Sequence, residues 1–233
     1  MTLTGVWLNA GGVLLAGVLG SFIRRGMPEK LKAALMTGLG LCVLYIGISG
    51  ISADTDTVVL VLSVSLGMAL GTALDLDGKL SRLGELIQQK LPLRDSQAAD
   101  GFVSSTLFVC VGAMSIVGGI ESGTQGTYDT FLAKTFIDSL VVFVMAATKG
   151  IGCCLSAFVA LFYQAALTLS AGALAKVTTG LVISQMSEIG SLLIVGIALN
   201  LLGITKIKVA NLILSPFLPV LFYLGQQMFR LAG

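Results

Sequence analysis

Asp138 and Lys149 are the residues of this sequence whose types and spacing most directly suggest chemistry. Both lie in 134–154, a stretch apolar enough to cross a lipid bilayer. Residues eleven apart on an α-helix return to within about 20° of one another, so the two charges should share one face, roughly 16 Å apart along the axis. Ionisable groups inside a membrane are costly and tend to face protein or water. The spacing therefore predicts an interior helix with a charged face.

Each of these two charges has a functional and a structural interpretation. Asp138 could bind or couple an ion, or it could be a carboxylate that is capped or hydrated at the outer end of its helix. Lys149 could take part in the same site, or its ammonium group could extend to the nearby inner boundary of the membrane.

Four further polar residues in apolar stretches are candidates for contact with a solute or ion. Asn200 lies inside an apolar segment with Gly196 four residues before it, so its amide should face a close helix neighbour. It would either form an interhelical hydrogen bond or contact a ligand, and the adjacent Tyr163 and Gln164 pose the same choice. Glu188 is expected in outer headgroup water, where a carboxylate at an entrance could also gather cations.

Several common chemistries are missing from the sequence. It contains no His, and none of its four cysteines forms a C-x-x-C pair. No metal or other cofactor is therefore expected, and buried thiols should behave as small apolar groups. There is no phosphate loop, nucleotide fingerprint, catalytic triad or pair of catalytic carboxylates either, so we expect the protein not to be an enzyme.

The composition is that of a membrane protein. Of the 233 residues, 55% are hydrophobic and 11% are charged, and the mean hydropathy is +0.97. Soluble domains carry about 25% charged residues. The formal net charge of +2 is too small to suggest nucleic-acid binding. We therefore predict one integral membrane domain over residues 1–233, all-α, with the lipid bilayer as its main partner.

The apolar segments predict a bundle of eight transmembrane spans. The 41 residues between Lys134 and Lys176 are too many for one span of about 20 residues and enough for two. Residues 78–91 have the leucine spacing of an amphipathic helix on the cytoplasmic surface. The predicted spans cover about 3–23, 33–51, 58–74, 102–120, 135–153, 155–175, 187–204 and 209–229.

Positive charges support this number of spans. With both termini outside, 11 Lys and Arg residues fall on the inner side and 3 on the outer side, which together are all 14. Cytoplasmic loops carry the excess of Lys and Arg. The alternative of seven spans would put Lys206 and Lys208 outside and weaken this bias.

Small residues at steps of four form predicted packing faces on three spans. Such faces let helix backbones approach closely, within one chain or between two copies. The residues of these faces are Gly12, Ala16 and Gly20, then Ser63, Gly67 and Gly71, then Ala146 and Gly150.

Two other patterns concern helix breaks and repeats. Gly118-Gly119 and Gly150-Ile-Gly152 could be unwound points, and Pro216 and Pro219 should break or kink the last span. The stretch beginning at Cys110 echoes the one beginning at Cys42, which suggests duplicated helical hairpins.

Taken together, these stretches resemble a bacterial multi-spanning membrane family catalogued as domain of unknown function 554. The resemblance runs nearly end to end. It implies a transporter-like protein of the bacterial inner membrane without an established substrate, although Lys149 departs from similar proteins, which tend to be uncharged there. The stretches that carry it are Leu39–Ile48, Gly67–Leu80, Cys110–Gly118, Ala133–Asp138, Gly150–Gly152, Tyr163–Gln164 and Gly190 through Asn200 to Gly203.

These observations lead to one functional hypothesis and one alternative. The hypothesis is an inner-membrane transporter or channel for a small solute or ion, with Asp138, Asn200 and Gln164 lining its site. The alternative is a non-transporting membrane scaffold, sensor or assembly partner that uses the small-residue faces for association. A homo-oligomer is compatible with both.

Overall fold

The computed structural model of the chain describes residues 1–24, 26–51, 56–90 and 97–232. Within these ranges the chain is all-helical, without a strand, as the sequence predicts. Among the described residues, six helices are long and apolar enough to cross a membrane, or up to eight if each of two bent helix pairs is one span. The helices are α1 Thr4–Arg24, α2 Glu29–Ser49, α3 Thr57–Ala73, α4 Leu76–Lys90, α5 Ala98–Cys110, α6 Ala113–Thr124, α7 Asp129–Lys149, η1 Ile151–Leu155, α8 Ser156–Leu169, α9 Ala171–Val177, α10 Gly180–Leu201, η2 Val209–Leu212, η3 Ser215–Phe217 and α11 Leu218–Ala232.

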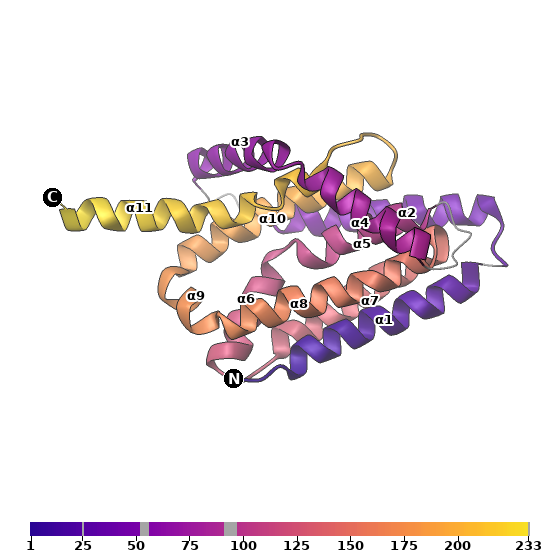
Figure 1. Cartoon of the computed structure of the whole chain (residues 1–233), viewed down its shortest axis with the longest axis horizontal. Coiled ribbons are helices and arrows are strands. Elements are labelled where there is room, and N and C mark those ends of the chain that lie inside the picture. Colours follow the sequence, from indigo (N-terminus) through magenta and orange to yellow (C-terminus); the bar gives the residue numbers. More distant parts are fainter. Residues whose placement is uncertain (25, 52–55, 91–96, 233) are drawn as a thin grey trace.

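Helix α1 lies beside α7 and runs in the same direction (Figure 1). Gly5 near the start of α1 packs on Phe131 near the start of α7, and Gly20 near its end packs on Ala146. We call the end of the bundle where α1 and α7 begin the amino-terminal end, and the opposite one the Lys149 end.

The other passes alternate between these two ends. Gly40 of α2 packs on Leu202 and Gly47 packs on Val195, so α2 and α10 are antiparallel. Likewise, α3 is antiparallel to the segment that holds η2 and η3, and α5 with α6 is antiparallel to α7. If each bent pair is counted once, the alternation returns the last pass to the amino-terminal end, so both termini belong to the same end of the bundle.

Local sequence explains where several helices begin and end. The Asp56 carboxylate accepts a hydrogen bond from the Val58 N–H at 2.9 Å and caps α3. Thr179 caps α10 in the same way, because hydroxyl and carboxylate oxygens satisfy backbone donors that a helix start leaves open. Gly150 ends α7 with a φ of +95°, a conformation in which glycine, lacking a Cβ, is not penalised.

The fourth predicted span is broken, but not where the sequence suggested. Helices α5 and α6 meet at Val111 and Gly112 with a bend of 55°, and Gly112 has a φ of +127°. The predicted break at Gly118 and Gly119 is wrong, because both lie within α6 and permit close approach of α7 and α8. The predicted break at Gly150 is correct.

Two further elements follow the sequence pattern closely. Residues 78–91, predicted as an amphipathic helix, correspond to α4, which bends by 54° from α3; Leu91 lies outside the described residues. The proline-containing segment is irregular, with η2 and η3 before α11 begins at Leu218.

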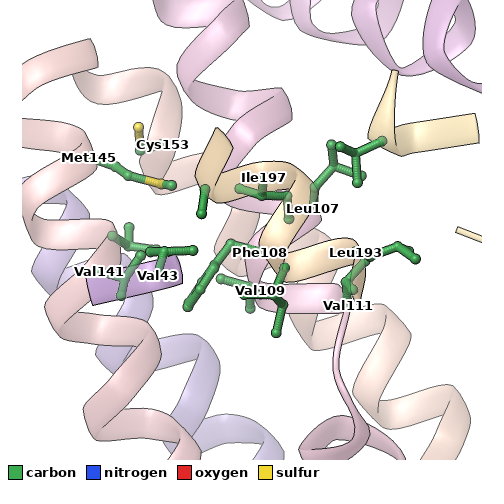
Figure 2. Packing of buried hydrophobic residues seen from close by; sticks show 14 of the residues in the cluster. Val43, Leu107, Phe108, Val109, Val111, Val141, Met145, Cys153, Leu193 and Ile197 are labelled. Atoms are coloured by element: carbon green, nitrogen blue, oxygen red, sulfur yellow. The ribbon is translucent and has the colours of Figure 1, made fainter. Parts of the chain in front are cut away.

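The apolar core lies where α2, α5, α7 and α10 meet. Figure 2 shows side chains from these four helices in one cluster, with Phe108 lying between the pair Val43 and Val141 and the side chain of Leu193. Large apolar side chains on the outer surface, among them Phe136 at 72% exposure, fit contact with lipid. Because lipid is as apolar as the core, close packing rather than water exclusion must hold the helices together.

The small-residue faces supply this close packing within the chain. A Cβ at Gly12 would overlap side chains of α7, and one at Gly20 would overlap the Phe143 carbonyl oxygen. Gly67 and Gly71 of α3 lie directly against the segment of Ser215 and Asn211. These four glycines therefore pack against other parts of the same chain and are not available for contact with a second copy.

Candidate functional site

A buried ion pair lies midway along α7. Lys134 is 4% exposed and Asp138 is 1% exposed. The Lys134 ammonium contacts both carboxylate oxygens of Asp138, at 3.0 Å for Oδ1 and 2.9 Å for Oδ2. The i, i+4 spacing brings the two side chains together on one helix face. Asp138 is nine residues into the helix, about 13 Å from its start, so the pair lies well inside α7 and not at its end.

Two amides extend this pair across α1 and α8. The Asn9 Nδ2 donates to Asp138 Oδ2 at 3.0 Å, and the Gln164 Nε2 donates to Asn9 Oδ1 at 3.0 Å. A carboxylate can only accept, so Asn9 must turn its NH₂ group toward Asp138, and its oxygen then requires the NH₂ group of Gln164. We call Asn9, Lys134, Asp138 and Gln164 the buried polar network.

Two buried oxygen atoms in or near this network have no hydrogen-bond partner among the described residues. Gln164 Oε1 is buried and has no hydrogen-bond partner within the described ranges, and neither has Ser139 Oγ beside Gly12. Buried polar groups are normally satisfied. The network therefore ends in an amide oxygen that a bound solute or water could engage.

The network borders the break between α5 and α6. Both α5 and α6 pack on α7 and α8, the helices that carry Lys134, Asp138 and Gln164. Tyr163 of α8 packs on an apolar cluster that includes Ile116 of α6. Irregular backbone at membrane depth is tolerated where protein or a water-filled cavity surrounds it. The break and the ion pair thus share one region of the bundle.

Lys149 belongs to a different site. Its ammonium group pairs with Asp100 Oδ2 at 2.7 Å and donates to Ser104 Oγ at 2.9 Å. The predicted charged face of α7 is therefore two separate ion pairs, one with Lys134 and one with Asp100.

A pocket of about 480 Å³ opens beside Lys149, where α4, α5, α7 and the segment after α10 meet. We call it the Lys149 pocket. Six charged side chains line it, three of each sign. They are Asp77, Glu85, Asp100, Lys149, Lys206 and Lys208.

Asn200 lines this pocket and not the buried polar network, contrary to the single site expected from the sequence. It is the penultimate residue of α10 rather than a mid-span residue. Its Nδ2 donates to the Ile207 carbonyl at 2.7 Å, and its Oδ1 accepts from Thr205 Oγ1 at 2.8 Å and from the Ile207 N–H at 2.9 Å. The predicted interhelical hydrogen bond is wrong, because the amide closes the loop that follows its own helix.

Glu188 also differs from its expected position. Helix α10 begins at Gly180, seven residues before the predicted span, so Glu188 lies two turns inside the helix. It is 7% exposed, and its Oε2 has no partner within the described ranges. The predicted location in headgroup water is therefore wrong.

Two members of the network, Lys134 and Asn9, were not among the predicted site residues. Lys134 is one of the three cations that the predicted topology places on the outer side, although its position four residues before Asp138 is the spacing of a helical ion pair. Asn9, by contrast, meets Asp138 across 129 residues of chain, and no local pattern indicates that contact.

The near end-to-end similarity to known sequences decides the family. The family described as "Protein of unknown function (DUF554)" matches residues 4–224. The chain belongs to this family. It is 25% identical over 219 residues to the "Uncharacterized membrane protein YdfK" of Bacillus subtilis (strain 168), covering 92% of this chain and 93% of that protein. It is 26% identical over 215 residues to the "Uncharacterized protein YqgA" of Escherichia coli (strain K12), covering 90% and 91%. No solved structure was found to match the chain.

Proposed function

We propose that this protein moves a small solute or ion across the bacterial cytoplasmic membrane, and that the buried polar network forms part of its route. The observation that supports the proposal is the Lys134–Asp138 pair at 2.9 Å, nearly inaccessible inside an apolar helix bundle.

The energetic cost of this pair favours a functional role over a structural one. Burying two charges costs several kcal/mol per ion, and apolar residues of similar volume often stabilise a protein as well or better. Ionisable residues in membrane segments commonly mark ion and substrate pathways. A solute that offers its own charge or hydrogen bonds could replace one partner of Asp138 for a time and be released again.

The interruption between α5 and α6 supports the same proposal. Transporters commonly build their sites near the bilayer midplane from discontinuous helices. Here the two helices that meet at Gly112, α5 and α6, both pack on α7 and α8, which carry the network.

The orientation that we propose follows the positive charges. Lys149, Lys206 and Lys208 all line the Lys149 pocket, and the excess of Lys and Arg marks the cytoplasmic side. The Lys149 end would therefore face the cytoplasm and both termini would lie outside. Arg25 and Arg94, which the charge count includes, lie outside the described residues.

The scaffold alternative draws less support from the fold. It required small-residue faces that are free for association, but Gly67 and Gly71 already pack on the chain itself. Replacing Gly67 by Leu would therefore disturb the fold and would not isolate an assembly function.

The proposal is tested by charge movement in proteoliposomes during concentration jumps of protons, sodium, potassium and small organic anions. Asp138→Asn should abolish a solute-specific current that the wild type shows. Asp129→Asn, the same change at an exposed position on the same helix, is the matched control and should keep the current.

Folded protein is a condition of this comparison. If Asp138→Asn does not fold, Lys134→Met/Asp138→Leu, which replaces both charges, serves in its place. Labelled solutes extend the test to electroneutral movement. Absence of flux for every solute offered, or flux that Asp138→Asn leaves unchanged, would contradict the proposal.

A further inference from the structure

The Lys149 pocket has an acidic wall and a basic wall. Asp77, Ser81 and Glu85 follow one another at steps of four on α4, and all three line the pocket. Steps of four keep side chains on one face of a helix. Lys206 and Lys208 line it from the segment after α10. The two signs of charge therefore come from different elements that line one cavity.

The charges of the two walls have no ion-pair partners. Within residues 1–24, 26–51, 56–90 and 97–232, Asp77, Glu85, Lys206 and Lys208 each lack an opposite charge within 4.0 Å. Asp100 and Lys149, by contrast, neutralise one another at 2.7 Å. The walls thus present two acids and two lysines to a shared space without neutralising each other across it.

Two side-chain amides hold the elements that carry these charges in place. Asn211 Oδ1 accepts from the Asp77 N–H at 2.9 Å, which joins the start of α4 to η2. The Asn200 side chain donates a hydrogen bond to the Ile207 carbonyl and accepts one from the Ile207 N–H. Ile207 is the residue between the two lysines. The pocket is therefore preformed, as sites for small molecules usually are.

We propose that the Lys149 pocket binds a small zwitterion, with its ammonium group at Asp77 and Glu85 and its carboxylate at Lys206 and Lys208. A simple anion would face the acidic wall and a simple cation would face the lysines, whereas one molecule with both charges complements both walls. The volume of about 480 Å³ falls within the range of roughly 300–1,000 Å³ of small-molecule sites.

This inference goes beyond the proposed function, because it concerns a separate pocket and is tested by binding alone. Lys149 is eleven residues from Asp138, about 16 Å along α7. Loss of transport in Asp138→Asn would leave zwitterion binding at the Lys149 pocket intact. Conversely, if no zwitterion binds at the Lys149 pocket, the proposal that the buried polar network forms part of a transport route is not affected.

The test is calorimetric titration of the full-length protein in lipid nanodiscs. The probes are glycine, β-alanine, 4-aminobutyrate and 6-aminohexanoate, whose charges lie at increasing separations. Acetate and ethylamine, alone and mixed, control for single charges. We expect saturable binding of the chain length that spans the walls and none for the separated ions.

Two wall variants and one control locate this binding. Glu85→Gln and Lys208→Gln each remove one exposed charge and should each weaken binding of the preferred probe at least tenfold. Asp129→Asn, an exposed residue on α7 outside the pocket, should leave it unchanged. The proposal is overturned if no probe binds, if acetate binds as tightly as the best zwitterion, or if both wall variants retain wild-type affinity.

Discussion

Replacing either member of the Lys134–Asp138 pair alone should lower the free energy of unfolding more than replacing both members together. Their contacts of 2.9 and 3.0 Å and their exposures of 4% and 1% define a buried pair. Removing one partner of such a pair leaves an uncompensated charge and costs about 3–5 kcal/mol. Lys134→Met and Asp138→Leu should each reduce the free energy of unfolding by that amount.

The double variant should be much less destabilised. It leaves no buried charge, and its main defect is the Asn9 amide donor, which loses Asp138 as acceptor. An unsatisfied buried donor costs about 1–3 kcal/mol. Because the single costs together reach at least about 6 kcal/mol, the coupling energy of the double-mutant cycle should be at least about 3 kcal/mol.

Reversible unfolding by sodium dodecyl sulfate in mixed micelles measures this cycle. The pair of Glu29 and Lys32, at 2.6 Å and with the Glu29 side chain 87% exposed, provides a matched cycle in which coupling of less than about 1 kcal/mol is expected, because solvent screens a pair that reaches the surface. Additive single effects at Lys134 and Asp138 would refute the reasoning, since they would mean that the two charges do not compensate one another.

Three other substitutions test the packing and the loop. Gly71→Ala should reduce the free energy of unfolding by about 1–3 kcal/mol, because its Cβ would overlap the Asn211 carbonyl oxygen; Gly38→Ala, which has open space, should not reduce it in the same unfolding assay. Gly112→Ala should lower the free energy of unfolding by about 1–3 kcal/mol, because few residues other than glycine adopt a φ of +127°. Its midpoint of thermal unfolding should fall, and an unchanged midpoint would contradict this backbone conformation at the bend. Asn200→Leu removes three hydrogen bonds from the loop after α10, so limited proteolysis should cleave that loop faster than in the wild type, and equal rates would argue against its closure by the amide.

Composition and small-residue spacing predicted much of the fold. The first predicted span, 3–23, nearly coincides with α1 (Thr4–Arg24), and the amphipathic segment 78–91 corresponds to α4. Of the small residues at steps of four, Gly12, Gly20, Gly67 and Gly71 lie in close contact with other parts of the chain. Apolar length and periodicity are local properties, so a single sequence contains this information. The duplication of hairpins stays a prediction.

Helix breaks could not be located with the same success. Gly118-Gly119 and the single Gly112 look alike in sequence, but the pair lies inside α6 and the single residue is at the bend. A glycine serves either close packing or an unusual φ, and only the neighbouring helices decide which. The start of α10 was misplaced because Glu188 was taken as a boundary residue, whereas it is buried in the bundle.

The candidate site was predicted in part. Asp138 and Gln164 do lie in one network, through Asn9, while Asn200 and Lys149 line a separate pocket. Residues on one helix face can be placed from spacing, but contacts between α1, α7 and α8 depend on how the helices pack. The sequence therefore indicated that Asp138 lies inside the bundle, but not that Lys134, Asn9 and Glu188 are buried as well.

The central claim, that a solute reaches the buried polar network from water, is tested most directly by thiol accessibility. Gln164→Cys would be made in protein whose four native cysteines are replaced by alanine or serine, reconstituted in liposomes and exposed to a small membrane-impermeant thiol reagent. Ala160→Cys, one turn earlier on α8 and 0% exposed in the apolar core, is the matched control. The account predicts modification at position 164 and none at 160. Protection of position 164 as complete as that of position 160 would contradict it.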